Sequence, residues 1–175
     1  MHNAEFCRTP VSETIKPNKN ITSTIYNADA QELLDWGHEQ YMEEVYRQSP
    51  ATFLGRLNIL KNMSGNYEPL DFKVSLGLNM YTAIKAGNTA DGKPIITTLR
   101  AVSNIIFGEN MRSTMPNTGL NPVIYYMSVM KIVGGYNQKQ NNGNGYNSGF
   151  PFFGEHTYSG SYIFYGYFGY FSEDE

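Results

Sequence analysis

Residues 134–171 read GGYNQKQNNGNGYNSGFPFFGEHTYSGSYIFYGYFGYF, and this stretch decides how the chain is read. It contains thirteen aromatic residues, many glycines and only two formally charged residues, Lys139 and Glu155. Burial of an aromatic ring removes a large apolar area from water, and soluble monomers rarely leave so large an apolar block exposed. The segment is therefore either the main part of the core or a surface that binds a partner.

The last part of this segment, residues 157–171, has the aromatic density that is typical of β-strands. Both faces of such a strand would carry aromatic rings, whereas a half-solvated antiparallel strand alternates apolar with polar residues. The strand therefore has to be covered on both sides, and we expect its rings to form an interface. The expected interface residues are Tyr158, Tyr162, Phe164, Tyr165, Tyr167, Phe168, Tyr170 and Phe171.

Amphipathic helices are predicted before residue 135, where apolar residues recur at three- and four-residue steps. The first begins at Asp29, because Asp29 and Glu32 have the spacing of a capping box. The alternation of apolar residues between 72 and 80 favours a strand, although a helix also fits part of it. The expected helices cover residues 29–48, 52–63, 94–108 and 122–133.

These elements predict an α+β fold in which about four amphipathic helices pack against a small antiparallel sheet. The sheet is expected to include the aromatic C-terminal strands. Residues 1–25 are polar and predict an extended or flexible N-terminal arm. Residues 26–175 are then a single α+β domain, and residues 134–171 are its aromatic, Gly/Asn-rich segment.

The charge pattern argues against nucleic acid as a partner. The net charge is −3, and the basic residues do not cluster into the stripe that nucleic-acid binding requires. The apolar run 123–133 is shorter than the roughly 18–20 residues of a spanning helix, and the N-terminus has no apolar run of a signal peptide. We therefore expect no membrane partner and a location in the cytoplasm or in an assembled particle such as a virion.

The most tempting chemical motif is 87–93, GNTADGK, which fits the phosphate-loop spacing GxxxxGK. A phosphate loop needs Ser or Thr after the lysine to bind magnesium, but Pro94 stands there, and Asp91 would repel phosphate. We interpret the motif as a turn and predict no cofactor.

Other titratable residues give weaker signals. His38 and Glu39 match the first two residues of the zinc-protease motif HExxH, but the second histidine is absent and Met42 stands in its place. Two alternatives to a solvated surface are a weak metal site made by His38, Glu39 and Glu43, and a nucleophile–base pair made by Cys7 and a histidine such as His156, which follows Glu155. Cys7, the single cysteine, lies in the expected arm. We predict no catalytic residue and no metal site.

The function expected from these features is that of a non-enzymatic structural or interaction subunit of a multi-chain assembly, for example a virion or tail component. Its partners would be copies of itself or other protein subunits. One alternative is a carbohydrate-binding module that uses Tyr and Phe rings as stacking platforms. The second alternative is a small enzyme with an acidic or histidine-containing site that the sequence does not reveal.

Overall fold

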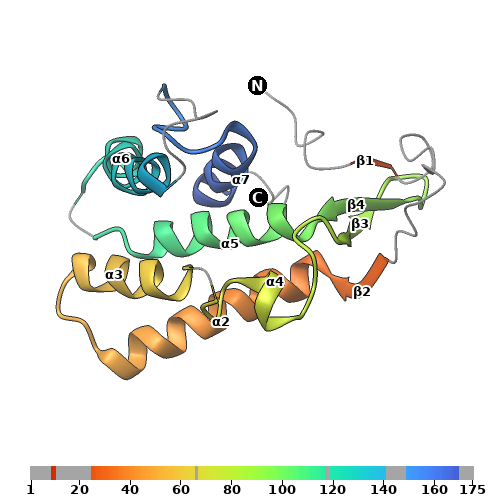
Figure 1. Cartoon of the computed structure of the whole chain (residues 1–175), viewed down its shortest axis with the longest axis horizontal. Helices are drawn as coiled ribbons and strands as arrows, with labels where there is room; N and C mark the ends of the chain where they lie inside the picture. The colour runs from red at the N-terminus through yellow and green to blue at the C-terminus, as the bar shows by residue number, and fades with distance from the viewer. Residues whose placement is uncertain (1–8, 11–24, 66, 117–118, 141–148, 170–175) are drawn as a thin grey trace.

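The computed structural model of the chain describes residues 9–10, 25–65, 67–116, 119–140 and 149–169 (Figure 1). Most of the expected arm, residues 1–25, lies outside this described part. The elements are β1 (Thr9–Pro10), β2 (Ile25–Asp29), α2 (Ala30–Gln48), α3 (Phe53–Met63), α4 (Phe72–Ser75), β3 (Ala83–Asn88), β4 (Pro94–Thr98), α5 (Leu99–Ser113), α6 (Pro122–Gln140) and α7 (Thr157–Phe168). The mixture of helices and strands confirms the α+β class, but the expected aromatic C-terminal strands are wrong, since that segment is helical.

Helix α5 is the centre of the fold. Figure 1 shows α2, α3 and α4 on one side of α5, and α6 and α7 on the other. The side chains of α5 that face these neighbours are almost inaccessible to water, among them Leu99, Val102, Ile106 and Met111. One cluster of buried side chains runs from Ala30 in α2 to Tyr167 in α7.

The first two helices begin where the sequence predicts. The Asp29 carboxylate accepts a hydrogen bond from the backbone N–H of Gln31 at 2.9 Å, and Glu32 reaches back to the Asp29 N–H at 3.3 Å. This is the expected capping box. Helix α3 begins after Thr52, whose hydroxyl accepts from the Gly55 N–H at 3.2 Å.

The third helix differs from the prediction at both ends. Pro94 opens strand β4 and not a helix, and the helix begins only after Thr98, whose hydroxyl accepts from the Ala101 N–H at 3.2 Å. Gly108 does not end the helix, which continues to Ser113. The helix expected over residues 94–108 thus combines strand β4 with the first part of α5.

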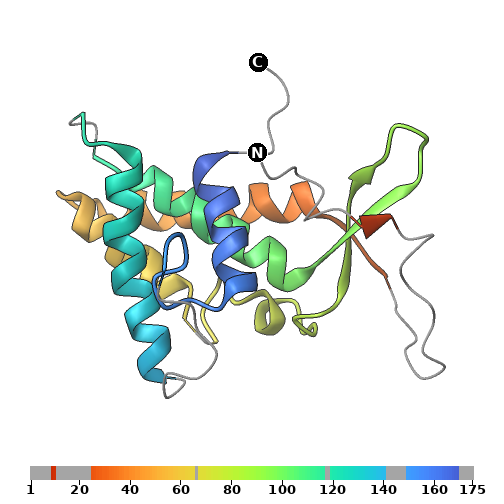
Figure 2. The same cartoon turned by 90° about the horizontal axis from the view of Figure 1, so that it is seen from above.

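The strands form a sheet in the order β1-β4-β3-β2. Strands β3 and β4 are an antiparallel hairpin, whose turn is closed by a 2.8 Å bond from the Thr89 N–H to the Lys93 carbonyl. The hairpin extends away from the helices (Figure 2). The purely antiparallel sheet that we expected is wrong in one respect, because β2 pairs in parallel with β3. Helices α2, α3 and α4 supply the long crossover that a parallel pair needs.

Residues 72–80 do not form the expected strand. Helix α4 takes the first four residues, and Phe72 is fully buried. The N–H groups of Ser75 and Leu76 bond to the carbonyl groups of Asp71 and Phe72, so the backbone turns helically. The alternating apolar residues of this segment therefore lie on a short helix and the loop that follows it.

Helix α7 replaces the expected aromatic strand because its buried residues, Gly166 among them, recur at helical spacing. A Cβ atom on Gly166 would lie 2.1 Å from the carbonyl oxygen of Ile105, and one on Gly108 would lie 2.2 Å from that of Ile163. The backbones of α5 and α7 therefore touch where each helix has a glycine.

Three buried tyrosines tie helices to distant backbone. The hydroxyl of Tyr41 donates to the Arg56 carbonyl at 3.3 Å, that of Tyr126 donates to the Pro151 carbonyl at 3.0 Å, and that of Tyr167 donates to the Pro122 carbonyl at 2.9 Å. The Tyr41 and Tyr167 side chains are 1% and 0% exposed. Burial disfavours the charged form and raises the pKa of both tyrosines to about 12.

Candidate functional site

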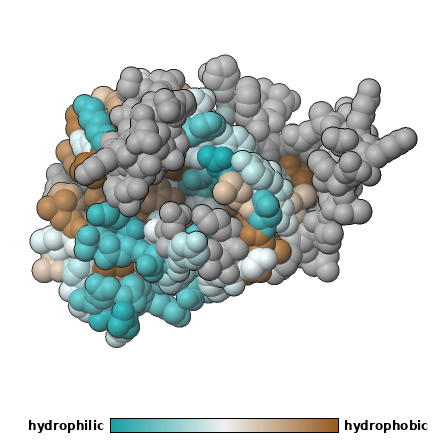
Figure 3. All heavy atoms as spheres, in the orientation of Figure 1, coloured by the Kyte–Doolittle hydropathy of each residue, from teal (hydrophilic) through white to brown (hydrophobic). Residues whose placement is uncertain are grey.

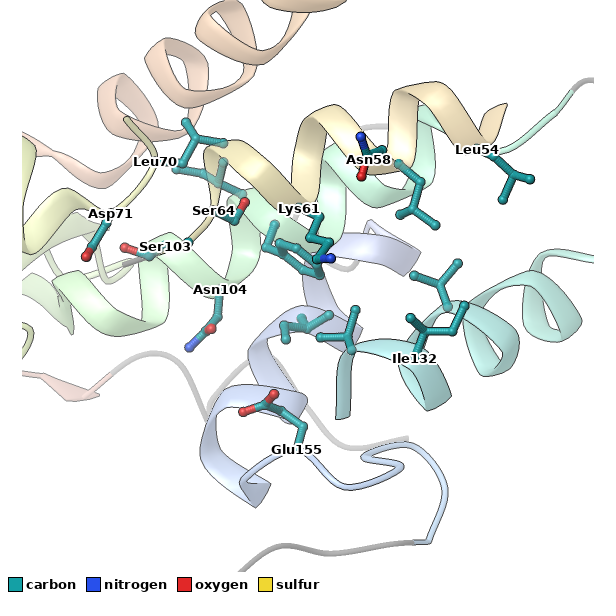
Figure 4. Close-up of a pocket in the computed structure, with 17 residues that line it drawn as sticks. Leu54, Asn58, Lys61, Ser64, Leu70, Asp71, Ser103, Asn104, Ile132 and Glu155 are labelled. Atoms are coloured by element: carbon teal, nitrogen blue, oxygen red, sulfur yellow. The ribbon is translucent and has the colours of Figure 1, made fainter. Parts of the chain in front are cut away.

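A groove of about 450 Å³ opens between α3 and α6, with α5 and the middle of α7 beneath it (Figure 4). Its volume lies within the range of small-ligand and side-chain binding sites. The residues that α3 contributes recur along one face of the helix, so the groove runs along it. They are Leu54, Leu57, Asn58, Lys61, and, just past its end, Ser64 and Gly65.

One part of the groove is apolar. Its floor is made by Ile106 and Ile163, which are 1% and 3% exposed. Leu54 of α3 and Ile132 of α6 also line it, yet their side chains are 59% and 65% exposed. Figure 3 shows hydrophobic residues at the surface on this side of the molecule. Large apolar side chains beside a hollow of this size are a typical sign of a binding surface.

The other part of the groove is polar. Figure 4 shows Asp71, Ser103 and Asn104 away from Leu54 and Ile132, and the Lys61 amino group over the middle of the groove. The Asp71 carboxylate accepts from the Tyr67 N–H at 3.0 Å, and the Ser103 hydroxyl donates to the Leu99 carbonyl at 3.0 Å. These bonds hold the two side chains in place.

Glu155 reaches the groove from the loop before α7. The loop can approach α6 because residue 134 is a glycine, at which a Cβ atom would lie 2.2 Å from the Phe153 carbonyl oxygen. We expected α6 to stop at Gly134-Gly135, but it continues to Gln140, so Gly134 serves close packing and not termination. Glu155 is 6% exposed, and one carboxylate oxygen accepts from the His156 N–H at 3.1 Å.

The residues that we expected to form an interface do not line this groove. Tyr162 and Tyr167 are buried in the core, whereas Phe164, Tyr165 and Phe168 are half-buried. Tyr158 is also half-buried, and its hydroxyl lies 2.6 Å from the Thr98 hydroxyl. Tyr170 and Phe171 lie outside the described residues. A partner contact through the half-buried rings stays a prediction.

The residues considered as metal ligands or catalytic groups do not come together in one site. The Nδ1 atom of His38 lies 2.7 Å from the Asn110 amide oxygen, while Glu39 and Glu43 are both exposed on the same helix. Within the described ranges, no three His, Cys, Asp or Glu side chains are grouped so that they could hold a metal ion. The side chain of His156 accepts from the Tyr158 N–H at 3.2 Å and so caps α7. Cys7 lies outside the described residues.

The 87–93 motif forms the turn of the β3–β4 hairpin, as interpreted, although it leads into a strand and not a helix. The amino group of Lys93 lies 3.0 Å from the Asp91 carboxylate. The lysine that a phosphate loop would use is therefore paired with an acidic neighbour in the same turn.

The groove was not predicted from the sequence. The helix expected over residues 52–63 contains Leu54, Leu57 and Leu60 at the spacing of a buried stripe, yet only Leu60 is fully buried. A usable signal was present, because the apolar residues of this eleven-residue helix cover more of its circumference than one core contact needs. The surplus apolar surface faces the groove.

Comparison of the chain with profiles of known protein families, with curated protein sequences and with solved structures gives no match. Among the described residues, no helix has the length and apolar character needed to cross a membrane.

Proposed function

We propose that this chain is a non-enzymatic interaction subunit of a multi-chain assembly, and that it binds another protein chain through the α3–α6 groove. The observation that carries the proposal is the exposure of Leu54 and Ile132, at 59% and 65%, beside a groove of about 450 Å³. Apolar side chains in such a position gain free energy when a partner removes them from water.

The shape of the groove favours a protein segment as the ligand. Its walls are two helices, α3 and α6, and its apolar floor comes from Ile106 and Ile163. Grooves of this construction accept the apolar face of a partner helix. The further expectation of a virion or tail component, with copies of the chain or other subunits as partners, belongs to the same proposal.

Site-specific photo-crosslinking tests the proposal. A photoreactive amino acid placed at Asn58, an exposed residue that lines the groove, should give a discrete protein adduct in native cells. The same amino acid at Tyr46, which is 87% exposed on α2 and does not line the groove, is the control and should give none.

The combined change Leu54→Ser and Ile132→Ser should abolish the Asn58 adduct. Because both residues are largely exposed, the variant should keep its unfolding free energy to within roughly 1 kcal/mol. Equal adducts at positions 58 and 46, or an Asn58 adduct that survives the double substitution, would refute the groove as the binding surface.

A further inference from the structure

The outer face of α6 is apolar, and no other described element covers it. Ile124 and Ile132 are 56% and 65% exposed, and Ser128 between them is exposed as well. These residues are four positions apart, so they form one row along the outside of the helix. Figure 2 shows α6 along one edge of the molecule, far from the β3–β4 hairpin. A row with this spacing is a ridge of the kind that packs against a second helix.

The row has the same order of residues in both directions. Ser128 is its centre, and an isoleucine lies four positions before it and four positions after it. If a second α6 crosses the first at Ser128 in the antiparallel sense, each Ile124 meets the Ile132 of the other copy. A two-fold interface requires this reciprocity, in which residue i contacts residue j and residue j contacts residue i.

Ser128 suits the crossing point because it is small and already has a hydrogen-bond partner. Its hydroxyl group donates to the carbonyl group of Ile124 in the same helix at 2.9 Å. Contact with a second copy therefore leaves no hydroxyl donor unsatisfied, which would otherwise cost free energy. A small side chain at this point also allows a short distance between the two helix axes.

The charge on α6 is compatible with a contact between two copies. Lys131 is the only charged residue in the stretch 122–133, and its amino group lies 5.7 Å from the centre of the Phe153 ring of the same chain. In the antiparallel pair the two Lys131 residues are six positions apart, or about 9 Å along the helix axis. The centre of the contact therefore contains no pair of like charges, which would disfavour association.

The apolar row is continuous with the groove. Ile132 lines the groove from α6 and Leu54 lines it from α3, so an isoleucine that packs on Ile132 also lies over the apolar part of the groove. Further exposed apolar side chains stand at the start of both helices, namely Phe53, Leu120 and Val123, at 37%, 37% and 41%. These side chains form the apolar centre of an interface and not the whole of the roughly 800 Å² per partner that a standard interface buries, so we expect a weak dimer.

We propose that the partner helix in the groove is α6 of a second copy of this chain, and that the two copies form a two-fold dimer whose α6 helices cross at Ser128. This inference rests on the proposed function and names the partner. Each copy supplies the isoleucine that inserts, Ile124, and the wall that receives it, which Ile132 and Leu54 form.

Charged residues at position 128 test the two-fold axis, because Ser128 faces its own counterpart there. The full chain should change from monomer to dimer in sedimentation experiments as its concentration rises through the micromolar range. Ser128→Asp and Ser128→Lys each place two like charges on the axis and should weaken dimerisation about tenfold or more. An equal mixture of the two variants should dimerise again, because an aspartate then faces a lysine.

Two kinds of control variant accompany this test. Ser128→Ala keeps a small residue at the crossing point and should dimerise like the wild type. Asn62→Asp and Asn62→Lys place the same charges at an exposed position of α3 that does not line the groove, and they should change the dissociation constant by no more than about twofold.

The outcomes separate this inference from the proposed function. A monomer at every concentration, a dimer that both charged variants leave unchanged, or a mixture that fails to dimerise would overturn the inference. An Asn58 adduct whose mass differs from that of two copies would overturn the second copy as the ligand but leave the groove as a binding surface. Loss of both the dimer and the adduct would overturn both proposals.

Discussion

The hydroxyl group of Tyr167 donates a 2.9 Å hydrogen bond to the carbonyl oxygen of Pro122. This bond connects α7 to the first residue of α6. The Tyr167 ring is fully buried and lies 5.1 Å, centroid to centroid, from the ring of Tyr126 on α6. The position of α6, and with it one wall of the groove, therefore depends on a residue near the end of α7.

Replacement of Tyr167 should show the two parts of this contact separately. Tyr167→Phe leaves the Pro122 carbonyl without its hydroxyl donor and should lower the unfolding free energy by about 1–3 kcal/mol. Tyr167→Ala also leaves a cavity and should cost about 3–5 kcal/mol. Urea denaturation measures both values. Tyr67→Phe, at a position 82% exposed, is the control, and a loss equal to that of Tyr167→Phe would contradict the prediction.

The helix crossing at Gly108 and Gly166 should not tolerate a methyl group. Gly166→Ala gains up to about 1 kcal/mol of helix propensity but forces the α5 and α7 backbones apart, with an expected net loss of about 1–3 kcal/mol or more. Gly160→Ala on the same helix is the matched control, since the nearest atom to the added methyl, 2.7 Å away, belongs to the movable ring of Phe152. Thermal melts in which both variants match the wild type would rule out a tight crossing.

Alkaline pH should unfold the protein through its buried tyrosines. The folded pKa of Tyr41 and of Tyr167 is about 12, above the ordinary value of 10, so the folded state holds these protons more tightly than the unfolded state. Their contribution to stability is complete below pH 10 and is lost as the pH rises from 10 to 12, at up to about 2–3 kcal/mol for each tyrosine.

Urea midpoints measured from pH 8 upwards, with tyrosinate absorbance as the second signal, check this pH dependence. Tyr41→Phe, which has no proton to lose, should give a shallower decline above pH 10 than the wild type. A wild-type midpoint that stays constant through this range would be evidence against buried, late-titrating tyrosines.

Glu109 should destabilise the protein at neutral pH. Burial raises the pKa of its carboxyl group above 4.5, although His38 opposes the shift. A raised folded pKa means that the stabilising contribution is present below pH 4.5 and is lost as the pH rises through the folded pKa. Glu109→Gln should therefore be more favourable at pH 7 than at pH 4, relative to wild type. Unfolding free energies at the two pH values, with exposed Glu39→Gln as control, measure the difference, and a reversed order would disprove it.

Local signals in the sequence predicted local structure correctly. The capping box at Asp29, the helix start at Thr52 and the turn before Lys93 all involve residues within four positions of one another, so the sequence shows them directly. The α+β class is confirmed, although none of the described strands lies at residues 72–80 or 157–169, where the sequence predicted them.

Helix α7 was missed because a high density of aromatic residues is typical of strands. The buried positions of α7 in fact recur at helical spacing, and glycines are among them. They are Ser159, Gly160, Tyr162, Ile163, Gly166 and Tyr167. Only the position of α5 shows that a glycine at 166 is needed for contact, and no local pattern contains that information.

The groove was missed for a related reason. Its lining joins residues as far apart as Leu54 and Ile163, together with Asn104 and Glu155 between them. Each looks ordinary in its own segment, since a leucine on an amphipathic helix is normally buried and a lone acidic residue is normally solvated. These residues come together only through tertiary packing, which the sequence patterns do not show.

The hydrogen bonds of three tyrosine hydroxyl groups constrain the donor residue but not the acceptor residue. Tyr41, Tyr126 and Tyr167 each supply a phenolic hydroxyl, but the acceptors at residues 56, 151 and 122 are main-chain carbonyl groups. Every amino acid has that carbonyl, so the side chain at an acceptor position can change while the bond persists, whereas only tyrosine reaches so far with both a ring and a hydroxyl. Distant relatives of this chain should thus be found more readily by the placement of these tyrosines than by the residues that they hold.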